Sequence, residues 1–300
     1  MNGKISNLSQ IAYVRRYTID GGVEDGLKVV EVNNGILRFI LNESKALDVM
    51  QLWHKGTNVS FVSKNGFTKR ETPFLNRFEG GMLYTCGLDS VGGREGFELH
   101  GTFHNQPARL IECRCDEDGI KIVAEIQDTS LFGKNLLMRR TVTTNIMGNN
   151  LSICDQLFNR GTKDEDYALL YHVNLGYPML DEGTEIISDP TFIQPRNEWS
   201  AKNIDSRTLR TTCIDNHEET CYFIKNKTPE ISVVNKALQK TFKLSYSDDT
   251  LPYFVQWNSS ASQDYALGTE VSTTLLDDGF KYCKLKVGEK VDFKLNIKIF

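Results

Sequence analysis

Apolar residues recur at every second position through long parts of this sequence. The pattern is clearest in three stretches, which span residues 120–126, 283–287 and 293–299. Successive side chains of a β-strand point to opposite faces, so this period predicts strands with one buried face and one exposed face. A helical period is not sustained over a comparable length, and only residues 44–54 suggest a short helical turn or two. The chain is therefore expected to be all-β with few short helices.

The order of these stretches favours one large antiparallel sandwich. The sequence Asp116-Glu117-Asp118-Gly119 separates two alternating stretches as a hairpin turn would, so neighbours in sequence are expected to pair. Strands do not alternate with long helices, which disfavours Rossmann and TIM-barrel folds. No internal repeat or Pro-rich linker divides the chain, so residues 1–300 are predicted to form a single domain. Lys294 and Lys298 suit an edge strand, although a central strand could carry them too.

Composition limits the partners that such a sandwich can have. The 300 residues are 40% apolar and 25% charged, which is enough for a sizeable core and excludes a disordered chain. The 35 Lys and Arg residues against 39 Asp and Glu residues leave a net charge of −4, with no long run of one sign. Binding to nucleic acid is therefore not expected, because it depends on clustered positive charge.

Other features bear on location and on metal binding. The most apolar segment, residues 167–180, is shorter than a membrane helix and contains His172 and Asn174. The N-terminal residues lack the unbroken apolar stretch of a signal peptide, so a cytoplasmic protein with no membrane partner is expected. The odd count of seven cysteines fits reduced thiols. Cys113 and Cys115 form a C-x-C without a second Cys or His pair, so no metal site is predicted.

His172 and Asn174 interrupt a segment that is otherwise strongly apolar. The two residues lie two positions apart, so on a strand they share one face. A buried polar group without a partner costs roughly 1–3 kcal/mol, so something must satisfy both side chains. The pattern favours the wall of a pocket, where a histidine can give or take a proton at neutral pH. A hydrogen-bonded histidine of the core is the alternative.

Four more polar or aromatic residues suggest a binding site. Arg77 stands among aromatic residues and glycines, where a guanidinium could hold sugar hydroxyls or a carboxylate. His100 precedes a glycine, so its ring could approach a small polar ligand. Trp257 offers a flat apolar face, and Glu270 follows an apolar strand and a glycine, as a candidate general base would. An arginine bonded to loop carbonyls, a structural histidine and a solvated glutamate remain the alternatives.

In this order, the polar segments resemble the galactose mutarotase-like superfamily, and specifically its aldose 1-epimerase-related branch. The resemblance covers roughly residues 27–300. It is carried by the Arg before Gly-Gly in residues 77–81, by Thr85-Cys86-Gly87-Leu88-Asp89, by Leu99-His100-Gly101, by residues 171–178 and by Gly268-Thr269-Glu270. The last motif continues as Val271-Ser272, where related proteins commonly have a proline.

The resemblance implies a β-supersandwich whose concave face binds an aldose, with no metal or organic cofactor. It implies that Glu270 removes the proton of the anomeric hydroxyl while His172 protonates the ring oxygen, so that the ring opens. The free aldehyde then rotates and recloses on either face. His100 would orient the sugar as the second histidine of the pocket. Contacts to the sugar are expected from Arg77, Asn174, Gln256, Trp257 and Asp89.

The predicted function is therefore that of an aldose 1-epimerase, which interconverts the α and β anomers of a hexose or related sugar. The hydroxyl-binding aspartate of classical galactose mutarotases has no clear counterpart here, and Gln256 is the nearest candidate. The same fold could thus serve an acidic or phosphorylated sugar. A protein that binds or senses a sugar without turnover is the other alternative. The sequence leaves the oligomeric state open between monomer and homodimer.

Overall fold

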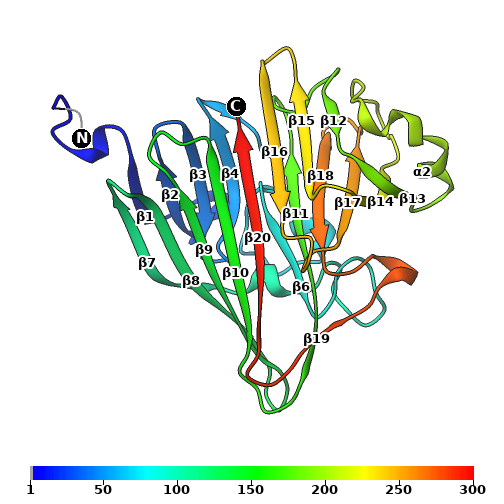
Figure 1. The fold of residues 1–300 in the computed structure, drawn as a ribbon, viewed down its shortest axis with the longest axis horizontal. Coiled ribbons are helices and arrows are strands. Elements are labelled where there is room, and N and C mark those ends of the chain that lie inside the picture. The colour runs from blue at the N-terminus through cyan, green and yellow to red at the C-terminus, as the bar shows by residue number, and fades with distance from the viewer. Residues whose placement is uncertain (1–2) are drawn as a thin grey trace.

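The protein is built almost entirely from antiparallel β-strands, which form three sheets (Figure 1). The computed structural model describes residues 3–300. The first sheet contains, in spatial order, β1 (Tyr13–Thr18), β2 (Lys28–Asn33), β3 (Leu37–Asn42), β4 (Asp48–His54) and β5 (Thr57–Asn58). The second contains β12 (Glu185–Ile187), β15 (Glu230–Asn235), β16 (Lys240–Tyr246), β20 (Lys290–Ile299), β10 (Asn150–Asn159), β9 (Asn135–Thr144), β8 (Gly119–Thr129) and β7 (Ala108–Asp116).

The third sheet contains seven strands and carries the polar residues singled out by the sequence. Its strands are β13 (Pro190–Pro195), β14 (Thr220–Asn226), β17 (Tyr253–Ser259), β18 (Ala266–Ser272), β11 (Glu165–Leu175) and β19 (Cys283–Leu285), with β6 (Tyr84–Leu88) paired to β11. The two α-helices are short: α1 (Phe74–Arg77) and α2 (Glu198–Lys202). The predicted all-β class is confirmed.

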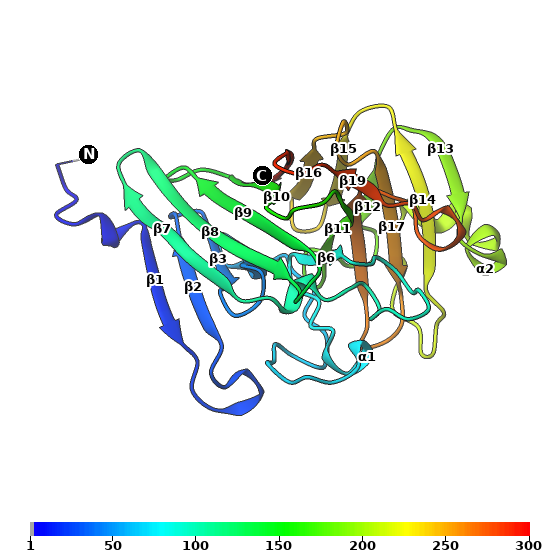
Figure 2. The ribbon, with the colours of Figure 1, turned by 90° about the horizontal axis from the view of Figure 1, so that it is seen from below.

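The sheets pack in layers around one continuous apolar core. Strands β7 to β9 lie in one layer and β1 to β3 in another (Figure 2). Phe39 of the first sheet, Ile122 of the second and Tyr171 of the third belong to the same buried cluster. Burial of such large apolar side chains stabilises each by about 1.5–3 kcal/mol. That this body is a single domain stays a prediction.

The alternating pattern predicts the buried face of β8 correctly, but Val287 of the stretch 283–287 is 48% exposed and lies beyond the end of β19. In β8 the alternating residues Ile120, Ile122, Ala124 and Ile126 are all buried. The predicted hairpin is also present, because β7 and β8 pair antiparallel and Asp116 lies opposite Gly119. The period-2 pattern therefore fixes the orientation of these strands correctly.

Two local expectations need correction. Residues 44–54 contain no helical turn: Ala46 and Leu47 adopt positive φ angles in a turn, and β4 begins at Asp48. The apolar residues there serve the core of a sheet, where Val49 is fully buried. The last strand, β20, is not an edge strand, because β16 and β10 flank it. Its lysines project from the polar face of a central strand.

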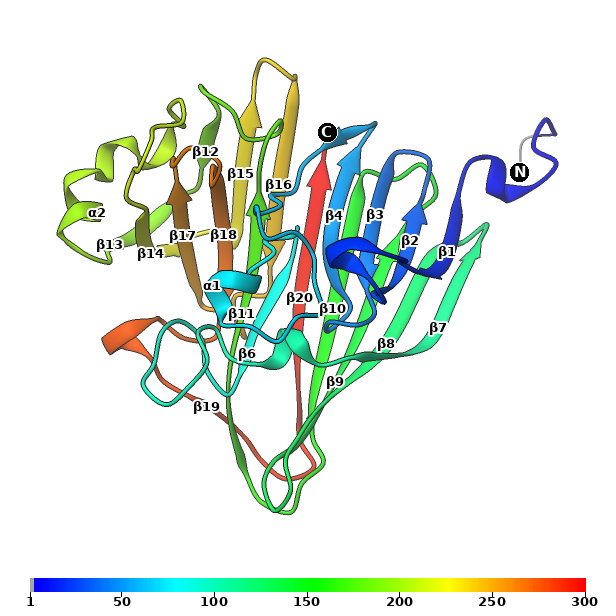
Figure 3. The same ribbon diagram turned by 180° about the vertical axis from the view of Figure 1, so that it is seen from behind.

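The outer face of the seven-stranded sheet is where the site is found. Alternation along β11 directs Leu169 and Tyr171 into the main core, and Ala168 and Leu170 into a second apolar cluster on the opposite face. Phe74 of α1 belongs to this second cluster, and Figure 3 shows α1 lying over the strands β11 and β18. Within residues 3–300, no helix has the length and apolar character needed to span a membrane.

Candidate active site

His172 and Glu270 lie side by side on the outer face of the third sheet. The two residues are directly opposite each other in the antiparallel pairing of β11 with β18. Nε2 of His172 is 3.4 Å from Oε1 of Glu270. Both side chains are buried, with residue exposures of 5% and 2%. We refer to these two residues as the candidate pair.

Gly268 makes room for the candidate pair. A Cβ atom at this position would lie 2.7 Å from Oε1 of Glu270 and 3.1 Å from Cε1 of His172. Both distances are shorter than an ordinary van der Waals contact, so a larger residue would displace one of the two side chains. The spacing Gly-x-Glu thus has a physical reason, because residues two apart on a strand share a face.

His100 reaches the candidate pair from a loop rather than from a strand. Its ring centroid is 5.6 Å from that of His172, and the two rings are nearly perpendicular. The backbone of His100 has a φ of 63°, a strained value for a residue with a side chain. The loop holds it there, because His100 donates to the carbonyl of Gly92 and accepts from the amide of Gly87. Gly101 follows with a φ of 73°, where a Cβ atom would meet Asp89 at 2.5 Å.

The candidate pair faces a cavity of about 550 Å³. This volume lies within the usual range of roughly 300–1,000 Å³ for small-molecule sites. His100, His172, Trp257 and Glu270 all line it. The Trp257 ring stands nearly perpendicular to the His172 ring, with centroids 5.6 Å apart. The structure therefore brings together four of the residues expected from the sequence.

Burial shifts the pKa values of the candidate pair in opposite directions. It raises the pKa of Glu270 to about 8, with a further increase from the negative charge of Glu219 and a smaller opposing effect of Arg196. Burial, followed by the positive charge of His100, holds the pKa of His172 well below 6.5. Burial and Arg196 lower the pKa of His100 to about 4. At neutral pH the empty site therefore holds neutral imidazoles and a protonated Glu270.

Asn174 lies behind the candidate pair and not in the cavity wall. It is fully buried on β11, and its Nδ2 donates to the backbone carbonyl of His172. Interaction with its side chain opposes the lowering of the His172 pKa. The side chain of Asn174 therefore contacts the backbone of His172 and does not line this cavity, and its contact with a sugar stays a prediction.

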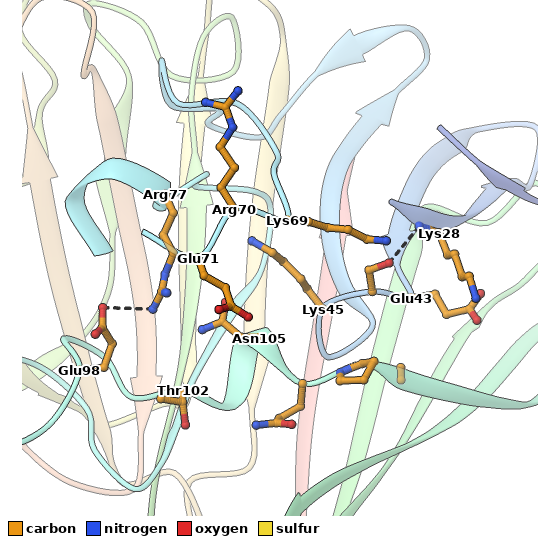
Figure 4. A pocket seen from close by; sticks show the side chains of 14 residues that line it. Lys28, Glu43, Lys45, Lys69, Arg70, Glu71, Arg77, Glu98, Thr102 and Asn105 are labelled. Atoms are coloured by element: carbon orange, nitrogen blue, oxygen red, sulfur yellow. Dashed lines mark hydrogen bonds and ion pairs between the residues drawn. The ribbon is translucent and has the colours of Figure 1, made fainter. Parts of the chain in front are cut away.

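Arg77 and Asp89 do not reach this cavity. Arg77 lines a second cavity, where its guanidinium pairs with Glu98 at 3.1 Å (Figure 4). Asp89 accepts hydrogen bonds from Ser90 and Thr102 and so ties together the loop that carries His100. The sugar contacts expected of both residues stay predictions, and this cavity does not support them. Their side chains already have protein partners that point them elsewhere.

Gln256 also lies outside the cavity. On β17, Trp257 faces the cavity and Gln256 faces the opposite side of the sheet, as period-2 alternation requires. Its Nε2 donates to the backbone carbonyl of Arg207 at 2.7 Å. Neighbouring residues of one strand face opposite sides, so the sugar contact of Gln256 stays a prediction that this cavity does not support.

Several cavity residues were not expected from the sequence. Arg196 follows β13 and is held by two hydrogen bonds to Asp277, at 2.7 and 2.8 Å. Glu219 precedes β14 and accepts a hydrogen bond from Nε1 of Trp257 at 2.6 Å. Lys64 and Asp264 form an ion pair at the rim. These residues lie in irregular segments, so no periodic pattern could have identified them.

No cluster of three or more His, Cys, Asp or Glu side chains within residues 3–300 has an arrangement that could hold a metal ion. The cavity instead combines an acid–base pair, a tryptophan face and ion-paired side chains. Such an arrangement can bind a small polar molecule and move protons between two of its atoms.

A family model described as Domain of unknown function (DUF4432) matches residues 24–299. The chain belongs to this family. No curated protein matches the sequence. The matched range includes every residue that lines the cavity described above.

Solved structures resemble this one over nearly its whole length. A protein of Klebsiella pneumoniae subsp. pneumoniae MGH 78578, named as a proposed aldose 1-epimerase, has a TM-score of 0.84 at 17% identity and covers 97% of this chain and 88% of its own. A galactose mutarotase-like protein from Clostridium acetobutylicum scores 0.73 at 12% identity, covering 97% and 99%. Galactose 1-epimerase from Lactobacillus acidophilus NCFM scores 0.70 at 11% identity, covering 96% and 99%. The predicted galactose mutarotase-like fold is confirmed.

Proposed function

We propose that this protein is an aldose 1-epimerase, which interconverts the α and β anomers of an aldose by opening and reclosing its ring. One observation carries the proposal: Nε2 of His172 lies 3.4 Å from Oε1 of Glu270, facing a cavity of about 550 Å³. Two of the structural neighbours have names that refer to the same activity.

Ring opening requires the loss of a proton from the anomeric hydroxyl and the arrival of a proton at the ring oxygen. Glu270 takes the first proton and His172 delivers the second. Burial favours both transfers, because a raised pKa makes Glu270 a stronger base and a lowered pKa makes His172 a stronger acid. A positioned acid and base each contribute about 10²–10⁴-fold to the rate.

The candidate pair shares one proton near neutral pH. In the empty site this proton is on Glu270, whose pKa is about 8. Movement of the proton to His172 prepares the pair for ring opening and leaves the net charge of the cavity unchanged. After ring opening, Glu270 again carries the proton and His172 is neutral. Once the aldehyde has rotated about C1–C2, reclosure reverses the two proton transfers.

The neighbouring side chains position the sugar and the acid. Trp257 presents a flat face on which the C–H side of a sugar ring can pack, and His100 lies within reach of the same ligand. The side chain of Asn174 holds the backbone of His172 by donating a hydrogen bond to its carbonyl. No cofactor takes part in this mechanism.

The test is the approach to anomeric equilibrium of freshly dissolved α-aldoses, followed by polarimetry or by NMR saturation exchange. The panel contains neutral, acidic and phosphorylated sugars. Wild-type protein is expected to accelerate the reaction of at least one sugar. Glu270→Gln and His172→Ala are each expected to lower kcat/KM by about 10²–10⁴-fold. Glu112→Gln is the control, because this half-buried carboxylate of β7 pairs with Lys121 outside the cavity.

The panel also separates the alternatives. Lack of acceleration for every sugar would exclude the proposed activity. Sugar binding without acceleration, retained in Glu270→Gln, would instead identify a sugar-binding or sugar-sensing protein. Acceleration confined to acidic or phosphorylated sugars would keep the mechanism and change the substrate.

A further inference from the structure

Glu219 lies at the rim of the cavity, where its charge acts on Arg196 without forming an ion pair with it. Each positive side chain there is already neutralised, Arg196 by Asp277 and Lys64 by Asp264. Glu219 forms no ion pair in the part of the chain that the structure describes, residues 3–300. Oε2 of Glu219 accepts a hydrogen bond from Nε1 of Trp257 at 2.6 Å.

The position of Glu219 is set by the sheet. It directly precedes β14, in which Cys221 pairs with Trp257 of β17. Trp257 in turn lies opposite Gly268 on β18. Gly268 is two positions before Glu270 on that strand. The hydrogen bond therefore fixes the indole between the strand end of β14 and the candidate pair. A tryptophan in a water-filled cavity would otherwise be free to change rotamer.

We propose that Glu219 is a positioning residue that holds the Trp257 indole beside the candidate pair and supplies the unpaired negative charge of the cavity. The proposal rests on the proposed function. It assigns a role to a residue of an irregular segment, through its contact with Trp257 and its charge.

The charge of Glu219 acts on Glu270 together with the other groups around that side chain. These groups are His172 on β11, Cys86 on β6, Cys221 on β14, and His100, Arg196 and Glu219 in the surrounding loops. Burial makes the largest contribution to the raised pKa of Glu270, and Glu219 adds to it. Removal of this one charge should let Glu270 lose its proton at a lower pH. Glu219 is exposed, so its effect should be modest and should weaken in high salt.

Glutamine at position 219 separates the two roles. Its amide oxygen can still accept the indole hydrogen bond, but the side chain has no charge. Alanine removes both. Glu218→Gln is the matched control, because this exposed glutamate is the adjacent residue and does not line the cavity.

The direct measurement is a ¹³C NMR titration of protein labelled at its glutamate carboxyl carbons, with the Glu270 signal identified by its loss in Glu270→Gln. In Glu219→Gln the Glu270 midpoint should fall by roughly half a pH unit, and the change should shrink in 1 M salt. The midpoint in Glu218→Gln should match that of wild type. An unchanged midpoint in Glu219→Gln would overturn the electrostatic role, whether or not the protein is an epimerase.

The rate measurement tests the positioning role. On the aldose that wild type turns over, the alkaline limb of kcat/KM should move down in pH in Glu219→Gln with little change in KM, because loss of the shared proton from Glu270 leaves no proton for His172 to deliver. Glu219→Ala should show the same movement and in addition a KM raised about fivefold, as expected for the loss of one hydrogen bond. Equal KM values in the two variants would refute the role of the Trp257 contact. Absence of turnover in wild type would count against the proposed function and leave the NMR result standing.

Discussion

Two buried groups of histidine and carboxylate side chains lie close together in this fold and behave in opposite ways. The first is the candidate pair. The second, which we call the paired cluster, consists of Asp48, Glu79, His104, Arg140 and Asp155. In the paired cluster His104 lies 2.6 Å from Asp48 and 3.2 Å from Glu79, and Arg140 bonds both Asp48 and Asp155. Every charge there has an opposite charge beside it.

The pKa values reflect this difference in partners. Burial alone would raise the pKa of Asp48, but Arg140 and His104 hold it below its ordinary value. Burial would lower the pKa of His104, but Glu79 and Asp48 raise it. In the candidate pair burial is not offset, and the shifts have the opposite sign. Similar burial thus occurs with neutralised charges in the paired cluster and with strongly shifted pKa values in the candidate pair.

The two groups are in contact through Tyr84. Its ring stacks on His104 with centroids 3.7 Å apart, and Tyr84 lies opposite His172 in the pairing of β6 with β11. The paired cluster therefore forms part of the rigid support under the outer face of the third sheet. A rigid support matters because acid–base catalysis requires the reacting groups to be held in place.

The largest difference expected between the paired cluster and the candidate pair is in their contribution to the free energy of unfolding. Asp48→Asn leaves Arg140 and His104 in the core with one carboxylate fewer, and should lower the free energy of unfolding by about 3–5 kcal/mol. Glu270→Gln should cause no such loss near neutral pH, because it replaces a protonated carboxyl with a neutral amide. Urea unfolding of both variants beside wild type provides the measurement. Equal losses of stability would remove the distinction between the two groups.

The next effect is a difference in pH dependence. Glu270 keeps its proton up to about pH 8 when folded, but loses it near 4.5 when unfolded. Between these values the folded state binds the extra proton, so stability falls as pH rises, by up to about 1.4 kcal/mol per pH unit. Asp48 changes stability with pH in the opposite direction. Its lowered pKa stabilises the folded state above pH 3.8, and this contribution is lost as the pH falls further.

Urea unfolding from pH 5 to 8 tests this difference. The advantage of Glu270→Gln over wild type should grow steadily across that window. Glu112→Gln serves as the control, and its unfolding free energy should run parallel to that of wild type. A constant difference between Glu270→Gln and wild type would mean that Glu270 has an ordinary pKa in the folded protein.

The smallest effect concerns space around the candidate pair. Gly268→Ala places a methyl group 2.7 Å from Oε1 of Glu270, and should lower the free energy of unfolding by about 1–3 kcal/mol. It should also lower kcat, because the methyl group displaces the candidate pair, and it would lie 3.1 Å from Cβ of Trp257 as well. Gly3→Ala is the control, since nothing lies within 4 Å of its Cβ position. Unchanged kcat in Gly268→Ala would show that the pair tolerates displacement.

The sequence predicts those features that follow from the spacing of nearby residues along a strand or in a turn. His172 and Asn174 are recognisable because two polar residues share one face of an apolar strand. Gly268 and Glu270 are recognisable from the spacing of the strand, and the hairpin after Asp116 from its turn residues. The same rule, applied strictly, places Gln256 and Trp257 on opposite faces, so only one of them could have faced the cavity.

The remaining residues depend on contacts that no local rule describes. Arg77 lies in a four-residue helix, too short for a period to indicate its direction. Arg196 and Glu219 enter the cavity from irregular segments. The turn before β4 was also missed, because its apolar residues are spaced by their packing in the core and not by a helix.

The alternation of apolar residues is enough to predict the class of fold and the buried face of a strand such as β8. These features follow from the two-residue period of a strand, which depends only on neighbouring residues. Tertiary structure decided the register that sets His172 opposite Glu270, the direction of Arg77 and the approach of Glu219 to Trp257. It also decided the pKa values, because these depend on which charges the folded chain brings to a buried group.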